Sequence, residues 1–217
     1  MTSFTNKLVL CLCLLAAASA ISAAPMCTTG DLIWNAGVNQ DYSCQLGDLL
    51  FSNFDVIGIT NDLTPTVSVG APLLAGPPET LLTFNPNLGS NFDIDVYFEV
   101  QTTDGSSISG ADLSVGGVGA NVSERICTGT ILGNQGNNCS PTGTQLAALA
   151  NTSGAPETFA TFTTPASTFY VFKDIGTQPG GALSTVTESF STPEPMTLSL
   201  MGAGLVGIGL LRRRRRG

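Results

Sequence analysis

The sequence predicts an all-β protein, an antiparallel β-sandwich, and three observations support this fold class. Between Phe92 and Val100 apolar side chains alternate with polar ones, as expected for a strand that buries one face. Similar short runs recur about every ten residues, which favours a sandwich over a helical fold. Charged residues make up only 11% of the chain, and its richness in Gly, Ser, Thr and Asn is typical of exported β-rich proteins. The topology, jelly-roll or immunoglobulin-like, stays open.

The other predicted strands follow the same reasoning in chain order. Each is a short run rich in β-branched or aromatic residues and is bounded by turn signals such as Gly-Pro-Pro or Asn-Pro-Asn. A short helix is expected over 144–150, and the Gly-rich segment 116–119 is expected to be a flexible turn. The predicted strands are 55–60, 66–69, 80–84, 92–100, 111–115, 121–127, 157–163, 167–173 and 185–190.

The N-terminus predicts a secretory signal peptide, a short helix within residues 1–23. Lys7 supplies the positive region, and 8–18 supplies an apolar stretch of suitable length. Small residues then offer cleavage after Ala20 or Ala23. We therefore expect the Sec translocon and signal peptidase to be partners of this chain.

Four cysteines remain once the signal peptide is removed. An even number in an exported chain predicts two disulfides, for which three pairings exist. Closeness in sequence favours Cys27 with Cys44 and Cys127 with Cys139. A zinc site is disfavoured because the chain has no histidine and no Cys-x-x-Cys pair among these cysteines.

The C-terminus carries a motif, an apolar segment and a basic cluster in direct succession. Pro193, Glu194 and Pro195 precede the 16 uncharged residues 196–211. As a transmembrane helix these residues would span about 24 Å, which is short for the hydrocarbon core of a bilayer. Arginine side chains that reach the headgroups and local thinning of the bilayer can compensate for this mismatch. The positive-inside rule keeps the cluster cytoplasmic, which leaves the motif on the outer side. The cluster consists of Arg212, Arg213, Arg214, Arg215 and Arg216.

This arrangement over 193–217 resembles the PEP-CTERM sorting domain of Gram-negative bacteria. The resemblance implies recognition by an exosortase through Pro193, Glu194, Pro195, the helix and the arginines. It also implies a transient inner-membrane anchor, cleavage near the motif, and delivery to the cell surface or an extracellular matrix. The scissile bond stays open.

Two ectodomain stretches are also similar to ones in many PEP-CTERM proteins of unassigned function. These are 44–54, and 170–175 followed by 186–190. The likeness implies a secreted β-sandwich and brings no catalytic residues. Physically, Phe51 and Phe54 are expected to be core anchors beside a disulfide, and Lys173-Asp174 an ion pair at a strand end.

The secreted domain, 25–192, is strongly acidic. It holds 15 of the 16 acidic residues but only two basic ones, Arg125 and Lys173, a net charge of −13. Such a field disfavours nucleic acid and anionic membrane surfaces as partners. Cations and neutral polymers such as exopolysaccharide remain compatible with it. No cofactor is expected.

The candidate chemistry of the domain is limited. The absence of histidine excludes Ser-His-Asp and Cys-His nucleophile systems and His-ligated metals. Asp93, Asp95 and Glu99 project from one face of a predicted strand, with neighbouring projections about 6.5–7 Å apart. They form a solvated sheet face, a weak Ca²⁺ site, or a glycosidase-type carboxyl pair.

These observations together predict a non-enzymatic protein with a structural or adhesive role in an extracellular polysaccharide layer or biofilm. One alternative is a secreted module that binds carbohydrate or Ca²⁺. A second is a secreted glycan hydrolase using Asp93, Asp95 and Glu99.

Overall fold

The computed structural model describes residues 24–35, 38–58, 66–71, 73–74, 79–86, 88–132 and 138–192. The predicted signal peptide, the Pro-Glu-Pro motif, the predicted transmembrane helix and the arginine cluster lie outside these residues. Within the described part every regular element is a strand, so no helix there is long and apolar enough to span a membrane.

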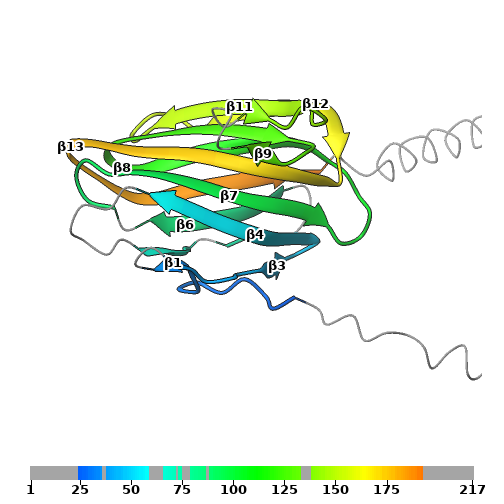
Figure 1. Cartoon of the computed structure of the whole chain (residues 1–217), viewed down its shortest axis with the longest axis horizontal. Helices are drawn as coiled ribbons and strands as arrows, with labels where there is room; N and C mark the ends of the chain where they lie inside the picture. The colour runs from blue at the N-terminus through cyan, green and yellow to red at the C-terminus, as the bar shows by residue number, and fades with distance from the viewer. Residues whose placement is uncertain are drawn as a thin grey trace, which may run out of the picture.

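Two long strands, β8 (Ile108–Cys127) and β13 (Thr168–Ser191), organise the molecule. They pair antiparallel along most of their length, with register shifts between Thr177 and Ala182 and between Leu183 and Thr185. Figure 1 shows β13 turning back at one end of the molecule, so that its two halves lie in different layers. The strands therefore form one continuous antiparallel sheet that folds over at this corner into a two-layered sandwich.

The two layers share β8 and β13 and are otherwise built from different strands. The first sheet contains β3 (Cys44–Leu46), β4 (Leu49–Gly58), β7 (Asp93–Thr102), the first half of β13, the second half of β8 and β11 (Gln145–Thr152), in that order. The second sheet contains β2 (Val38–Asn39), β1 (Leu32–Asn35), β5 (Thr66–Val69), β6 (Glu79–Pro86), the second half of β13, the first half of β8 and β12 (Thr158–Ala166). A small separate hairpin joins β9 (Ile131–Leu132) to β10 (Asn138–Cys139).

The sandwich confirms the all-β prediction but corrects two local expectations. The segment 116–119 is not a flexible turn, because it lies inside β8 and pairs with the bent middle of β13. The segment 144–150 is not a helix either. Most of it belongs to β11, which pairs with β8 from Cys127 to Asn121. Pairing along β8 outweighs the local helical preference of an Ala-rich segment.

The core lies between the sheets and is rich in phenylalanine. Phe51, Phe169 and Phe190 are fully buried, and the rings of Phe169 and Phe190 lie 5.3 Å apart across the two halves of β13. Phe54 stacks on Phe98 at the same distance. Each buried ring stabilises the fold by about 1.5–3 kcal/mol, so the predicted anchors Phe51 and Phe54 are confirmed.

Both favoured disulfides are present. Cys27 is bonded to Cys44, and Cys127 is bonded to Cys139. The first ties the segment before β1 to β3, beside Phe51, with which Cys44 pairs in register. The second ties the end of β8 to the β9–β10 hairpin. Loops of this size contribute about 3 kcal/mol each in the chain-entropy account.

Candidate functional site

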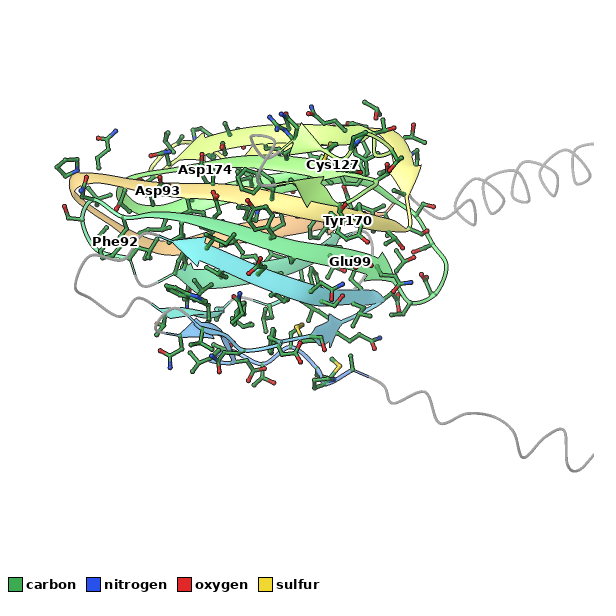
Figure 2. The ribbon with its side chains drawn as sticks, viewed as in Figure 1. Phe92, Asp93, Glu99, Cys127, Tyr170 and Asp174 are labelled. Atoms are coloured by element: carbon green, nitrogen blue, oxygen red, sulfur yellow. A yellow bond between two sulfur atoms is a disulfide. The ribbon has the colours of Figure 1, made fainter. Side chains whose placement is uncertain are left out.

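The outer face of the first sheet carries the acidic side chains that the sequence singles out. Asp93, Asp95 and Glu99 alternate along β7 with buried apolar residues, as predicted, and Tyr97 shares their outward face. The paired strand β13 adds residues in register: Asp174 opposite Asp95, and Tyr170 opposite Glu99. Figure 2 shows Asp93 and Asp174 toward one end of this face and Tyr170 and Glu99 toward the other.

The acidic end of this face is a pair of carboxyl groups. Burial, followed by the charge of Asp93 and a hydrogen bond with it, raises the pKa of Asp174, while a hydrogen bond with Ser123 opposes this rise. Asp95 accepts a long hydrogen bond, 3.5 Å, from the hydroxyl of Tyr97. The hydrogen bond between Asp93 and Asp174 and the one from Tyr97 to Asp95 make this end of the sheet face polar.

The three predicted carboxylates do not converge. Glu99 lies at the other end of the face from Asp93, and its Oε2 accepts a 2.7 Å hydrogen bond from Nδ2 of Asn53. Over the described ranges, no three Asp, Glu, Cys or His side chains are grouped closely enough to hold a metal ion. The face is therefore split into an acidic end and an aromatic end.

The aromatic end is a groove. Its volume is about 320 Å³, and it lies between a bulge in β4 and the β9–β10 hairpin. Register shifts between Ser52 and Asp55, and Asn53 adopts a positive φ of 55° there, a conformation that Asn tolerates better than most residues. The bulge leaves Asn53 exposed beside Glu99. The lining consists of Asn53, Tyr97, Phe98, Thr130, Ile131, Tyr170 and Val171.

Two tyrosines supply the aromatic surface of the groove. Tyr97 and Tyr170 are half-buried, and the ring of Tyr97 leans on that of Phe172 at 5.0 Å. Burial, and next the charge of Asp95, raise the pKa of Tyr97 to about 12. Burial and then Glu99 likewise raise the pKa of Tyr170. Both phenols therefore stay protonated at neutral pH and can donate a hydrogen bond.

The second wall of the groove comes from the β9–β10 hairpin, which supplies Thr130 and Ile131. The hairpin is held by the Cys127–Cys139 disulfide and by a 2.7 Å hydrogen bond from Nη1 of Arg125 to Oδ1 of Asn138. One cysteine and the arginine belong to the same strand, β8. The disulfide thus fixes one wall of the groove as well as stabilising the fold.

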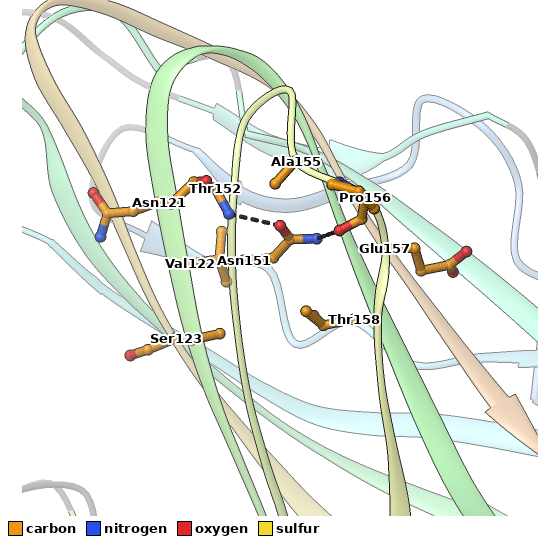
Figure 3. Close-up of a pocket in the computed structure, with 10 residues that line it drawn as sticks. Asn121, Val122, Ser123, Asn151, Thr152, Ala155, Pro156, Glu157 and Thr158 are labelled. Atoms are coloured by element: carbon orange, nitrogen blue, oxygen red, sulfur yellow. Dashed lines mark hydrogen bonds between the residues drawn. The ribbon is translucent and has the colours of Figure 1, made fainter.

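A second pocket, of about 510 Å³, lies where β11 and β12 diverge from β8 (Figure 3). Its central side chain is the buried Asn151, whose amide donates to the carbonyls of Leu113 at 2.8 Å and Pro156 at 3.1 Å. Its carbonyl accepts from the backbone N–H of Thr152 at 2.7 Å. These bonds satisfy the buried amide of Asn151 and close the β11–β12 turn.

Sequence reasoning missed the groove and misplaced one cation. Tyr97, Tyr170 and Asn53 come together through strand register, a bulge and a hairpin, none of which a linear pattern shows. Lys173 does not pair with Asp174 at a strand end. It is fully buried between the sheets and binds Glu124 and Glu188. One signal was available: Lys173 has the same parity along its strand as the buried Val171 and Ile175.

Comparison with known proteins gives only distant likenesses. No family model matches the chain, and no curated protein matches it. Among solved structures, a family 61 carbohydrate-binding module in complex with β-1,4-galactotriose is 10% identical with a TM-score of 0.34, over 62% of this chain and 86% of that one. A family 29 carbohydrate-binding module is also 10% identical, with a TM-score of 0.23, over 75% of this chain and 84% of that one.

Proposed function

We propose that this chain is an exported, non-catalytic protein that binds a neutral polysaccharide in the groove between β4 and the β9–β10 hairpin. The observation that carries the proposal is the grouping of two tyrosine rings and the Asn53 amide around a groove of about 320 Å³, with Glu99 hydrogen-bonded to that amide. In this proposal the PEP-CTERM-like segment 193–217 directs the protein to an exosortase, and then to the cell surface or its extracellular polysaccharide.

The chemistry of the groove suits a sugar ring. A pyranose offers apolar C–H faces, which pack on aromatic rings, and a rim of hydroxyls, which need both donors and acceptors. Tyr97 and Tyr170 supply ring surface and phenolic donors. Asn53 and Glu99, already hydrogen-bonded to each other, supply an oriented amide and carboxylate.

Electrostatics favours a neutral ligand over an anionic one. The domain 25–192 carries a net charge of −13, and the acidic pair Asp93 and Asp174 lies on the same face as the groove. Uronic-acid or sulfated polymers would be repelled by this field, whereas uncharged hexose polymers would not. Export is supported by the two disulfides, which are typical of oxidising compartments.

The test is binding to a panel of neutral polysaccharides, including β-1,4-galactan, mannan and cellulose, by affinity electrophoresis and calorimetry. Wild-type protein should be retained by at least one polymer, and Tyr170→Ala and Asn53→Ala should each weaken that binding about tenfold, or about 1.4 kcal/mol. Phe159→Ala is the matched control, because Phe159 is an aromatic residue 63% exposed on β12 of the other sheet. Absence of retention on every polymer, or equal weakening by Phe159→Ala, would contradict the proposal.

A further inference from the structure

Three ionisable side chains meet between the two sheets, and none of them lines the groove. Lys173 and Glu188 are 0% exposed and Glu124 is 4% exposed. Lys173 lies directly opposite Glu124 in the first sheet, on the paired strands β13 and β8. Glu188 comes from the second half of β13, in the opposite sheet, where its neighbours in register are the buried Leu82 and Leu113.

The amine contacts both acids. Nζ of Lys173 donates to Oε2 of Glu124 and to Oε2 of Glu188. The second oxygen of each carboxyl, Oε1, is buried and has no hydrogen-bond partner. A buried ion costs several kcal/mol even when it is paired, and each unsatisfied oxygen adds to that cost. As a set of ions, this cluster is therefore an expensive arrangement for a core.

The protonation of the cluster distinguishes the two acids. Burial, and then the charge of Glu124, raise the pKa of Glu188 well above its usual range. Burial lowers the pKa of Lys173, but the charges of Glu124 and Glu188 outweigh it and raise that pKa. These directions favour a Lys173 ammonium beside a neutral carboxylic acid on Glu188. A carboxylic acid is an electrophile, whereas a carboxylate is not.

We propose that Lys173 and Glu188 are joined by an intramolecular amide bond, formed by the protein itself with Glu124 as the catalytic proton carrier. Glu124 takes a proton from the Lys173 ammonium, and the free amine attacks the carboxyl carbon of Glu188. Glu124 then returns that proton to the departing hydroxyl, which leaves as water. Of the two protons left on the nitrogen, one passes to Glu124 and the other stays as the amide N–H. One C–N bond forms, one C–O bond breaks, and no oxidant or cofactor is needed.

The site favours this condensation in two ways. Fixed contact between amine and acid replaces a bimolecular encounter, and the closed apolar surroundings keep out the water that would reverse the reaction. The reaction also removes the ammonium charge and one oxygen from the core, and leaves Glu124 as a neutral acid beside the new amide. The product links the two sheets of the sandwich through the two halves of β13.

The bond can be detected in the full exported chain by reduction, unfolding, trypsin digestion and mass spectrometry. Arg125 and Lys173 are the only trypsin sites between Lys7 and Arg212. With the bond present, trypsin cannot cut after Lys173, and a single peptide starts at Ile126, runs through Glu188 and is lighter than its sequence by one water. Normal cleavage after Lys173 with unmodified masses would overturn the proposal. A peptide ending at Arg125 that stays attached to Lys173 would overturn the choice of Glu188.

Three variants test the roles of Lys173 and Glu124, and the mass measurement on the wild-type protein does not depend on them. Lys173→Met should restore the full sequence mass, and Glu124→Gln should leave most of the chain uncoupled while the strands still form by circular dichroism. Asp174→Asn, next to the cluster but on the outer face, is the matched control and should couple like wild type. Full coupling in Glu124→Gln would remove Glu124 from the reaction, and loss of coupling in Asp174→Asn would contradict a reaction confined to the core.

Discussion

Single side chains set the pH response of the fold, and Asp112 is the clearest case. The hydroxyl of Ser189 on β13 contacts Oδ2 of Asp112 at 2.6 Å and also contacts Oε1 of Glu79 on β6. Burial, and next a hydrogen bond with Glu79, raise the pKa of Asp112 to about 6, while a hydrogen bond from Asp112 lowers that of Glu79. As the pH falls below about 6, the pair therefore takes up one proton, largely on Asp112.

The sign of the effect on stability follows from this. An ordinary Asp titrates near 3.8, so between that pH and about 6 the folded protein keeps a proton that the unfolded chain has lost. Protonated Asp112 thus stabilises the fold at low pH, and this contribution is lost as the pH rises through about 6.

We expect Asp112→Asn to raise the free energy of unfolding at pH 7, by about 1 kcal/mol or less once solvent screening is allowed for. The gain should vanish near pH 4, because the wild-type side chain is then neutral as well. Thermal unfolding at both pH values measures the difference. Asp48→Asn, at an exposed turn, should behave like wild type. An equal gain at pH 4 and pH 7 would show that titration of Asp112 is not the cause.

At the scale of the elements, the folded corner of β8 and β13 decides the architecture. Gly117 lies there with φ at 133°, a conformation that side chains rarely adopt. A Cβ at this position would lie 2.3 Å from the carbonyl oxygen of Ala182 and 3.1 Å from Cα of Leu183. Both neighbours are backbone atoms of the partner strand and cannot move independently of it. The corner therefore needs glycine.

Gly117→Ala should destabilise the protein by about 1–3 kcal/mol, through backbone strain and the forced separation of β8 from β13. Urea unfolding measures the loss. Gly89→Ala is the matched control, because a Cβ there would meet only the ring of Phe92 at an ordinary 3.6 Å. If both variants lost the same stability, the close approach at the corner would not be the reason.

At the scale of the whole molecule, the distribution of charge bears on the proposed choice of ligand. Of the two basic residues in the domain 25–192, Lys173 is buried and Arg125 donates a hydrogen bond to Asn138. The surface of the described part is thus dominated by acidic and uncharged groups. Such a surface disfavours anionic polymers as ligands and is compatible with the proposed binding of a neutral polysaccharide.

The proposed sorting step belongs to this scale as well. The intact protein from its native host should lose the mass C-terminal to the Pro193–Pro195 region only when exosortase is active. Protein from a host without exosortase should retain the arginine cluster, 212–216. Intact-mass measurement of both samples checks this and locates the cut. A full tail in both would mean a permanent anchor and would remove the argument for delivery to the matrix.

Much of the fold could be predicted because its signals are local. The alternation around Asp93 and Glu99 predicts both the strand and its outward face, since successive side chains of a strand must point to opposite sides. The pairing of Cys127 with Cys139 follows from their closeness in sequence and is confirmed. For these features the residues that decide the structure are near neighbours along the chain.

The sequence by itself determined the all-β class, the favoured disulfides, the acidic character of the domain and the apolar segments near both ends of the chain. Only the tertiary structure decided that 116–119 continues a strand, that Lys173 faces two acids in the core, and that Tyr97, Tyr170 and Asn53 share a groove. Each of these depends on partners far away in sequence. A segment adopts the conformation in which residues distant in sequence satisfy its hydrogen bonds and pack against its side chains. No short pattern along the chain indicates which residues those are.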